Sequence, residues 1–318
     1  MAAVRDQGDG RPLIEGERSR PASFADYPGV YRAADAAAVA VRRQHFAAEA
    51  VQLLLNPVAA GLVLLSAIAL LRLSYAVLTA VSTTMLVIVL WFVRAARWQK
   101  LWYECRSAAE DVKRLTWRYM MALEPFPPGM LTPDAPFVKA LDAVLHAHPE
   151  IREMLGQRAD ALTPPVTAEM RRVRKGSFEE RADFYLEARV EPELAWYAAK
   201  ARRHAALDRR WFAGLVTVQV AAVLSAIWLA VRIGANPGPA TAAESAVPLL
   251  AALGSAVMGW QRSKRFADLS GAYAGTAHAL AGLVSARPPV SDEEAQREWI
   301  EAVEAALASE HEAWRLMM

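Results

Sequence analysis

Few residues of this chain have the types and spacing that catalysis or metal binding requires. His146 and His148 are two residues apart, which on a helix places their side chains about 200° from each other, so a shared metal ion would need a nonhelical backbone. Cys105 is the single cysteine, which excludes an intrachain disulfide and a multi-cysteine zinc site. The sequence has no glycine-rich phosphate loop, no HExxH pair and no G-x-S-x-G motif. We therefore expect no enzymatic activity, no cofactor and no metal site.

A second group of polar residues lies within long uncharged segments. Such side chains either line an aqueous path or form hydrogen bonds between helices, which contribute about 0.6 kcal/mol each on average. No acidic or basic residue lies in the middle of these segments, which argues against a proton- or ion-coupled transporter. The candidate pore-lining residues are Gln52, Asn56, Tyr75, Thr79, Ser82, Thr83 and Gln219.

The uncharged segments are long enough to cross a membrane. Hydrophobic residues make up 54% of the chain, above the usual share of about 45–50%. At about 1.5 Å per residue, helices over residues 51–71, 73–93 and 211–231 would each match a hydrocarbon core of about 30 Å. A fourth span, at about residues 245–261, is weaker, and a re-entrant or surface helix is the alternative there. The predicted fold class is an all-α membrane protein with two tandem transmembrane helical hairpins and long cytoplasmic amphipathic helices.

Basic residues cluster at one end of every predicted span. Because positive charge is retained on the cytoplasmic side, we expect a multi-pass protein of the inner membrane with both termini in the cytoplasm. The formal net charge is only +2, which gives no indication of a nucleic-acid partner. The basic clusters are Arg42 and Arg43; Arg94, Arg97 and Lys100; Arg202, Arg203, Arg209 and Arg210; and Arg262, Lys264 and Arg265.

The two halves of the chain follow one plan, which indicates a duplicated module. Each half has an arginine-rich leading helix, a hairpin and a long exit helix, and the order Trp, Gln, base recurs at Trp98 and Trp260. A disordered tail is predicted at 1–25, a first module at 26–123, a linker with a short helix at 124–176 and a second module at 177–318. These ranges describe an organisation of two modules joined by a linker.

The linker and the helix starts have local signals of their own. The proline-rich beginning of the linker cannot form one helix, and residues 136–155 are predicted to form a short amphipathic helix. Ser177 with Glu180, and Ser291 with Glu294, have the spacing of capping boxes.

Each exit helix carries a seam of side chains spaced alternately three and four residues apart, which is typical of a coiled coil. The seams pack either on each other within one chain or between subunits, and both alternatives are open. Gly271, Gly275 and Ala279 form an adjacent line where another backbone can approach closely. The seam residues are Trp98, Leu101, Cys105, Ala108, Val112, Leu115 and Tyr119, then Phe266, Leu269, Tyr273, Thr276, Leu280 and Leu283.

Two stretches before the hairpins resemble a known family. The run Tyr31-Arg32-Ala33-Ala34-Asp35 resembles one subtype of the SLATT family, two-transmembrane effector domains associated with SMODS and SLOG proteins. The segments at 185–190 and 196–203 resemble another subtype, with Tyr185, Trp196-Tyr197 and Lys200 in a fixed order. The resemblance implies two tandem SLATT-like modules.

The resemblance also implies a function. Family members are thought to form pores or perturb the membrane in bacterial conflict systems, so we expect an antiphage-type effector that assembles into a homo-oligomer in the lipid bilayer. A separate sensor or nucleotide-signalling protein is expected to gate it. The alternatives are a nonconducting scaffold that recruits a cytoplasmic partner and a small-solute channel.

Overall fold

The computed structural model describes residues 27–68, 72–157, 164–235 and 246–317, and within these ranges the chain forms helices and turns without a strand. Side chains are described throughout except at 66–68, 72–73, 153, 155–157 and 309–317. The predicted all-α fold is thereby confirmed for this part of the chain, whereas the predicted disordered tail lies outside it.

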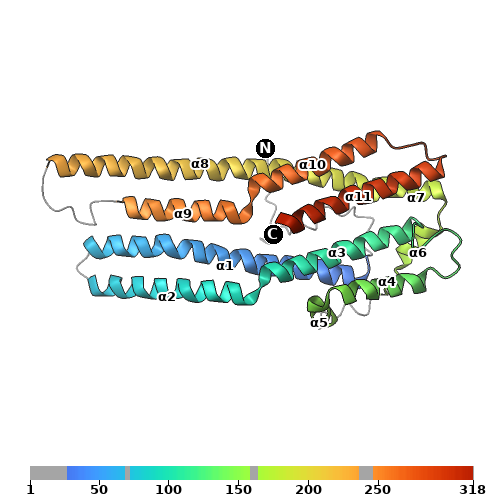
Figure 1. Ribbon diagram of the computed structural model, residues 1–318, viewed down its shortest axis with the longest axis horizontal. Coiled ribbons are helices and arrows are strands. Elements are labelled where there is room, and N and C mark those ends of the chain that lie inside the picture. The colour runs from blue at the N-terminus through green and yellow to red at the C-terminus, as the bar shows by residue number, and fades with distance from the viewer. Residues whose placement is uncertain (1–26, 69–71, 158–163, 236–245, 318) are drawn as a thin grey trace, which may run out of the picture. The chain divides into compact units, whose positions relative to one another are not determined.

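Figure 1 shows the order of the helices. They are α1 (Gly29–Ile68), α2 (Arg72–Ala96), α3 (Trp98–Met120), α4 (Asp134–Ala147), α5 (Pro149–Gln157), α6 (Ala168–Lys175), α7 (Phe178–Tyr185), the π-helix η3 (Leu186–Val190), α8 (Glu191–Ala235), α9 (Val247–Lys264), α10 (Phe266–Ser285) and α11 (Glu293–Met317).

The helices contribute to two compact units. The first unit, here called the helical body, contains residues up to Ala40, from Trp102 to Tyr197 and from Thr276 onward. The second, the hairpin unit, contains Val41–Leu101 and Ala198–Gly275. Both halves of the sequence therefore contribute helices to each unit.

The helical body has an aromatic core. Trp117, Tyr119, Phe126, Phe137 and Tyr185 are each almost completely buried. Tyr119 packs edge-on against Phe126 and Phe137, with ring centroids 5.8 and 5.1 Å apart. Trp117 packs edge-on against Tyr185 at 5.5 Å. Buried aromatic rings contribute large apolar area, so these contacts hold α3, α4 and α7 together.

The hairpin unit has the opposite distribution of apolar side chains. All of the large hydrophobic side chains that are exposed in the described residues belong to this unit, except Leu131 and Val138. Three helical stretches, Gly29–Leu65, Ser74–Met120 and Phe178–Ala235, are long and apolar enough to cross a membrane. Their apolar windows are almost entirely unburied within the chain, as expected for helices whose outer faces contact lipid.

The fourth predicted span corresponds to α9, which has 18 residues and is not among those three stretches. Residues 236–245, which precede it, lie outside the described residues. A full fourth crossing therefore stays a prediction.

Each hairpin ends at an arginine with a left-handed backbone. Arg97 separates α2 from α3 with φ 47°, and Arg265 separates α9 from α10 with φ 49°. These two arginines mark equivalent junctions of the two halves. The proposed equivalence of Trp98 and Trp260 is wrong, because Trp98 begins α3 whereas Trp260 lies within α9, before the junction.

Three local predictions have different outcomes. The capping box of Ser177 and Glu180 is confirmed. The helix expected over 136–155 is two helices, because Pro149 disfavours a helical backbone at His148 and ends α4 there. At the start of α11 the capping residue is Asp292, whose carboxylate accepts the Ala295 amide at 3.1 Å, so the prediction of Ser291 is wrong by one residue.

Candidate functional site

A π-helical turn, η3, joins the short helix α7 to the long helix α8 in the helical body. Pro192 has no amide hydrogen, and in a regular α-helix its ring would clash with the carbonyl of Ala188. The wider turn of η3 directly precedes this proline and provides more room for the ring. Tyr185, which directly precedes that turn, and Arg189, which lies within it, both reach the same carboxylate of Glu304 on α11.

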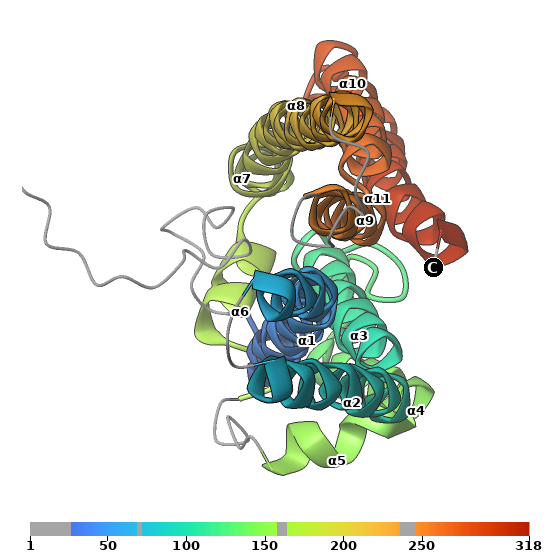
Figure 2. The ribbon, with the colours of Figure 1, turned by 90° about the vertical axis from the view of Figure 1, so that its left-hand side faces the viewer.

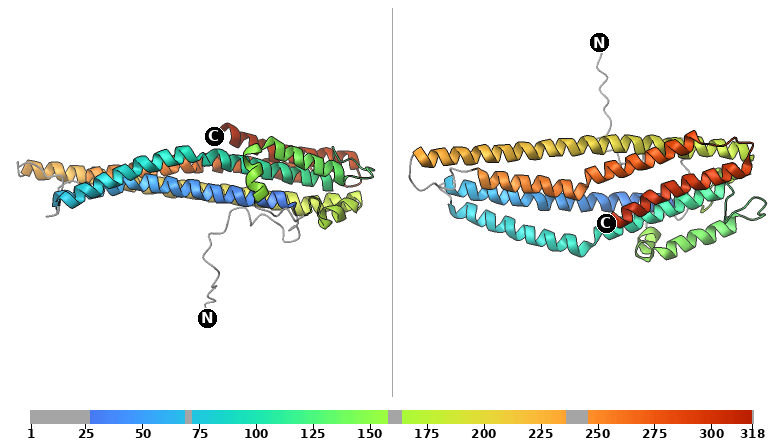
Figure 3. Two further views of the ribbon diagram at one scale, coloured as in Figure 1. Left: turned by 90° about the horizontal axis from the view of Figure 1, so that it is seen from below. Right: turned by 45° about the horizontal axis from the view of Figure 1, so that its top comes forward.

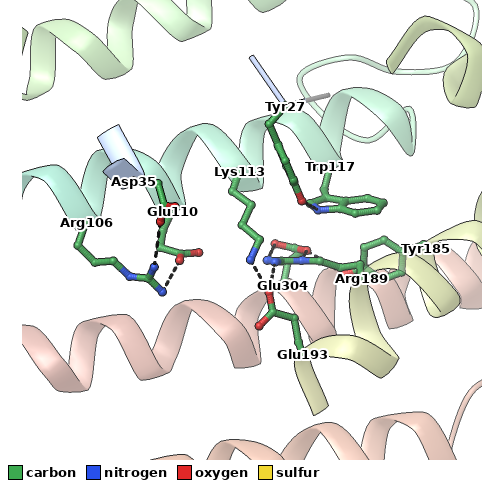
Figure 4. A network of polar contacts seen from close by, with 10 residues as sticks. All are labelled: Tyr27, Asp35, Arg106, Glu110, Lys113, Trp117, Tyr185, Arg189, Glu193 and Glu304. Carbon is green, nitrogen blue, oxygen red and sulfur yellow. Dashed lines mark hydrogen bonds and ion pairs between the residues drawn. The ribbon is translucent and has the colours of Figure 1, made fainter. Parts of the chain in front are cut away.

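The contacts around Arg189 form a continuous polar network (Figure 4). Arg189 Nε donates to Glu304 Oε1 at 3.1 Å, and Tyr185 Oη donates to the same oxygen at 2.9 Å. Arg189 Nη1 donates to Glu193 Oε1 at 2.9 Å. That oxygen also accepts a hydrogen bond from Lys113 Nζ of α3. Two cations and two carboxylates thus neutralise one another between α3, η3, α8 and α11.

Burial and charge act in opposite directions on these groups. Burial alone would raise the pKa of the Glu193 carboxyl, but Lys113 and Arg189 together hold this pKa below its usual range. Burial alone would lower the pKa of the Lys113 ammonium, but the attraction of Glu193 raises the pKa above its usual value. Burial and the nearby charge of Glu304 raise the pKa of Tyr185. The network therefore holds its charges over a wide pH range, and Tyr185 remains a neutral donor.

A second set of contacts joins α1 to α3. Trp117 Nε1 donates to Tyr27 Oη at 2.9 Å, just before α1 begins. Arg106 on α3 lies 2.5 Å from Glu110 and 3.9 Å from Asp35 of α1. Together with the Arg189 network, these contacts connect the first half of the sequence to the second within the helical body. Because cations and carboxylates are paired in both sets, the contacts clamp these helices together.

The candidate pore-lining residues of α2 do not share one environment. Tyr75, Thr79 and Ser82 are partly covered by the rest of the chain, and the covered stripe continues at Leu86. Thr83 is exposed together with Thr84. The hydroxyls of Thr79 and Thr83 donate to the carbonyls four residues earlier, at 2.8 and 2.9 Å. The donors are thus satisfied inside α2, while the oxygen of Thr83 remains on the outer surface.

The other candidates lie on α1 and α8. Asn56 and Gln219 are exposed, and Gln52 is partly covered. The Gln219 amide nitrogen lies close to Gly254 of α9, at 3.2 Å from where a Cβ atom would stand. The structure therefore brings Gln219 against α9 and leaves the candidates without a common centre among the contacts described.

Small residues place α9 between two other helices of the hairpin unit. A Cβ on Gly259 would stand 2.6 Å from a methyl group of Leu53 in α1, while Gly254 faces α8 through Val218 and Gln219. Figure 2 shows α9 beside α1 and close to α8. Glycine permits this close approach, as is common between membrane helices.

Most seam residues of the exit helices are buried. On α3, Cys105, Ala108, Val112 and Tyr119 are buried, while Trp98, Leu101 and Leu115 are partly exposed. On α10, Phe266 and Tyr273 pack against His204 of α8, with ring centroids 6.2 and 5.3 Å apart. Leu269, Thr276 and Leu280 are buried, and Leu283 is partly exposed. Much of both seams is thus covered within a single chain.

The glycine line of α10 lies on the other side of that helix. Nothing in the described structure lies within 4 Å of a Cβ placed on Gly271 or Gly275, and Ala279 is exposed. Figure 3 shows α11 running beside α10, and Trp299 of α11 donates to the Leu283 carbonyl at 2.7 Å. Among the described residues, none makes the close approach that these glycines permit.

The two histidines have separate partners. His148 lies between Glu104 and Asp111 of α3, at 2.7 and 3.3 Å from its two ring nitrogens. His146 is exposed and contacts the Asp142 carbonyl of its own helix. The described residues contain no cluster of three or more side chains of the metal-binding types His, Cys, Asp and Glu.

Family models match nearly the whole of this arrangement. Residues 28–182 match SMODS and SLOG-associating 2TM effector domain 3, and residues 185–314 match domain 1 of the same series. The chain belongs to the SLATT family. Its two SLATT domains stand in tandem, and such domains are effector domains associated with bacterial conflict systems. No curated protein and no solved structure matches the chain.

The residues of the Arg189 network are divided between the two SLATT ranges. Lys113 lies in the first SLATT match, and Arg189, Glu193 and Glu304 lie in the second. The matched range of the second domain begins at Tyr185, so the motif that resembles the family contains the centre of the network. The buried ionic contact is thus made between the two SLATT domains of one chain.

The sequence analysis did not predict this network. Glu304 lies on the apolar stripe of α11, between Val303 and Leu307, and an acid in that position is a signal for a buried partner. Arg189 and Glu193, one helical turn apart, are a second signal. Neither signal identifies Lys113, because its partner lies 80 residues further along the chain.

Proposed function

We propose that this SLATT protein is a membrane effector that assembles from several copies and permeabilises the bilayer when a separate protein activates it. The observation that carries the proposal is the contrast between the two units. The helical body has a buried aromatic core, whereas the hairpin unit carries all but two of the large hydrophobic side chains that are exposed among the described residues. A surface of this kind must be covered by lipid or by other membrane helices.

Polar groups on the exposed side of α2 support the assembly of several copies around an aqueous pore. Thr83 and Thr84 are exposed in a helix whose other exposed side chains are mostly apolar. Their donors are bound within the helix, so the oxygens can face lipid at small cost and can face water after assembly. The proposed pore lining is therefore Thr83 and Thr84, and Thr79 serves helix packing.

Homo-oligomerisation is supported by the glycine line of α10. Gly271 and Gly275 each weaken an exposed helix by about 1 kcal/mol relative to alanine, and no other described part of the chain lies close to them. We propose that α10 of another copy approaches this line. The separate activator would then act on the helical body, and the proposal includes no catalytic reaction and no nucleic-acid partner.

The proposed topology is a multi-pass protein of the inner membrane with four crossings and both termini in the cytoplasm, supported by the basic residues at the end of each hairpin. Reporter fusions after Arg72, Ala168 and Met318 test it. A periplasmic signal at Ala168, or a cytoplasmic signal at Arg72, would contradict this topology.

Planar-bilayer recording of the purified full chain with its activator tests the pore. Thr83→Val combined with Thr84→Val removes two oxygens with little change of shape, so the conductance should fall while oligomer size is kept. Thr79→Val is the matched control on the covered stripe and should leave the conductance unchanged. An unchanged current in the double variant would exclude these residues as pore lining. No current in the activated wild type would favour the nonconducting scaffold.

A further inference from the structure

Three aromatic side chains join three helices of the hairpin unit at the point where basic residues replace apolar ones. Phe46 of α1 packs edge-on against Trp260 of α9, with ring centroids 6.3 Å apart. Trp260 lies 6.2 Å from Trp211 of α8. The Lys264 ammonium stands over both partners of the first pair, 3.1 Å from the Phe46 centroid and 4.5 Å from the Trp260 centroid. Trp and basic side chains in this arrangement are typical of a membrane–water interface.

Exposed arginines lie next to the aromatic junction along the chain. Arg43, Arg209, Arg210 and Arg262 are exposed and each lies within three residues of one of the three rings along the chain. In the part of the chain that the structure describes, none of these four guanidinium groups forms an ion pair with a carboxylate.

The acidic residues near the junction do not neutralise that charge. Glu49 accepts a hydrogen bond from Ser263 and lies 3.8 Å from His45. Asp208 is the other acidic residue adjacent to the junction along the chain. The exposed arginines therefore create a positive potential that favours an anion.

An apolar stripe begins next to Arg209. Phe212, Val216, Val220 and Val223 follow it at spacings of three and four residues, so they share its face of α8. Their exposed fractions are 60%, 44%, 51% and 58%. One helix face thus presents a cation followed by about three turns of apolar surface, which complements a molecule with an anionic head and a hydrocarbon chain.

We propose that the outer face of α8, which carries Arg209 and Phe212 beside the aromatic junction, binds an anionic phospholipid. Arg209 lies two residues before Trp211 on the helix, so this face points away from the contact between Trp211 and α9. Arg209 and Arg210 contact its phosphate, and an acyl chain lies along Phe212 and Val216. A zwitterionic lipid has the same chain but its quaternary ammonium would face the arginines, so the site discriminates by headgroup charge. The proposal does not depend on pore formation, because it concerns only the lipid bound at the hairpins.

Thermal unfolding of the full chain in a neutral detergent tests the proposal. The protein is titrated with dioctanoyl phosphatidylglycerol, with dioctanoyl phosphatidylcholine of the same chain length, or with inorganic phosphate. We expect phosphatidylglycerol to raise the unfolding midpoint at the lowest concentration. Arg209→Gln combined with Arg210→Gln should weaken the apparent affinity for this lipid about thirtyfold, which corresponds to about 1 kcal/mol for each arginine.

A matched control removes the same charge outside the hairpin unit. Arg114→Gln combined with Lys139→Gln changes two exposed basic residues of the helical body and should bind phosphatidylglycerol as the wild type does. If the double arginine variant does not fold, Arg209→Gln alone should give a loss of about fivefold.

Three results would overturn the proposal. Equal stabilisation of the wild type by phosphatidylglycerol and phosphatidylcholine would show that the site does not select by headgroup charge. Equal stabilisation by inorganic phosphate would assign the site to a free anion. An unchanged affinity for phosphatidylglycerol in a folded Arg209 variant would show that this arginine does not bind the lipid.

Discussion

The Arg189 guanidinium lies 3.1 Å from the carboxylate of Glu304, although 115 residues separate the two in the sequence. Both side chains are almost inaccessible to solvent, at 4% and 2%. The pair connects the π-helical turn that precedes α8 to the last helix of the chain. If one partner of such a buried pair is removed, the other charge is left buried without compensation, which destabilises the folded state.

Removing one partner of this pair should destabilise the protein more than removing both. Arg189→Met leaves the Glu304 carboxylate buried with only Tyr185 as a donor, and we expect a loss of about 3–5 kcal/mol in the free energy of unfolding. In the double variant Arg189→Met and Glu304→Leu, the Lys113–Glu193 pair remains balanced, so the loss should be smaller. Chemical denaturation of the full chain in detergent measures all four proteins of this cycle. Additive losses would show that the two residues are not coupled.

The Lys113–Glu193 pair predicts a stability plateau bounded at both ends of the pH scale. Because the folded-state pKa of Glu193 is lowered, its contribution is complete above the unfolded value of about 4.3 and is lost as pH falls through the folded value. Because the folded-state pKa of Lys113 is raised, its contribution is complete below about 10.4 and is lost as pH rises through the folded value.

Unfolding midpoints of the wild type and Glu193→Gln between pH 3 and pH 11 measure this effect. The variant should be less stable on the plateau and should lose less stability on acidification, since glutamine does not titrate. If the unfolding midpoints of the two proteins fall equally on acidification, the acid sensitivity belongs to other carboxylates.

The contact between α1 and α9 should tolerate only a small side chain at Gly259. Alanine requires only a shift of the Leu53 methyl group, so we expect a change below about 1 kcal/mol. Leucine forces the helices apart and should cost about 1–3 kcal/mol. The matched control is Gly214→Leu on α8, where nothing lies within 4 Å. Thermal stability in detergent should fall for Gly259→Leu and hold for Gly214→Leu.

The start of α11 offers a test of a single capping residue. Asp292→Ala removes the acceptor of the Ala295 amide and should cost about 1 kcal/mol. Ser291→Ala, one residue earlier, should leave the free energy of unfolding unchanged. Chemical denaturation of both variants shows which residue caps the helix. A larger loss in the free energy of unfolding for Ser291→Ala would support Ser291 as the capping residue, as predicted from the sequence.

The sequence by itself determined the helical fold, the three clear membrane segments and the SLATT family. These features depend on local patterns: an uncharged run of sufficient length specifies a membrane helix, and Tyr185 with its neighbours specifies the family without reference to the rest of the chain. Pro149 is also a local signal: it disfavours a helical backbone at His148 and divides the predicted 136–155 helix into α4 and α5.

Only the tertiary structure decided which polar residues meet. Lys113 reaches Glu193 across 80 residues and Arg189 reaches Glu304 across 115, and no helical period contains that information. The same holds on α2, where Thr79 and Thr83 occupy one face by spacing but differ in exposure because only one edge of that face is covered by the chain. Helical periodicity fixes which side chains share a face, and the packing of distant helices fixes what that face contacts.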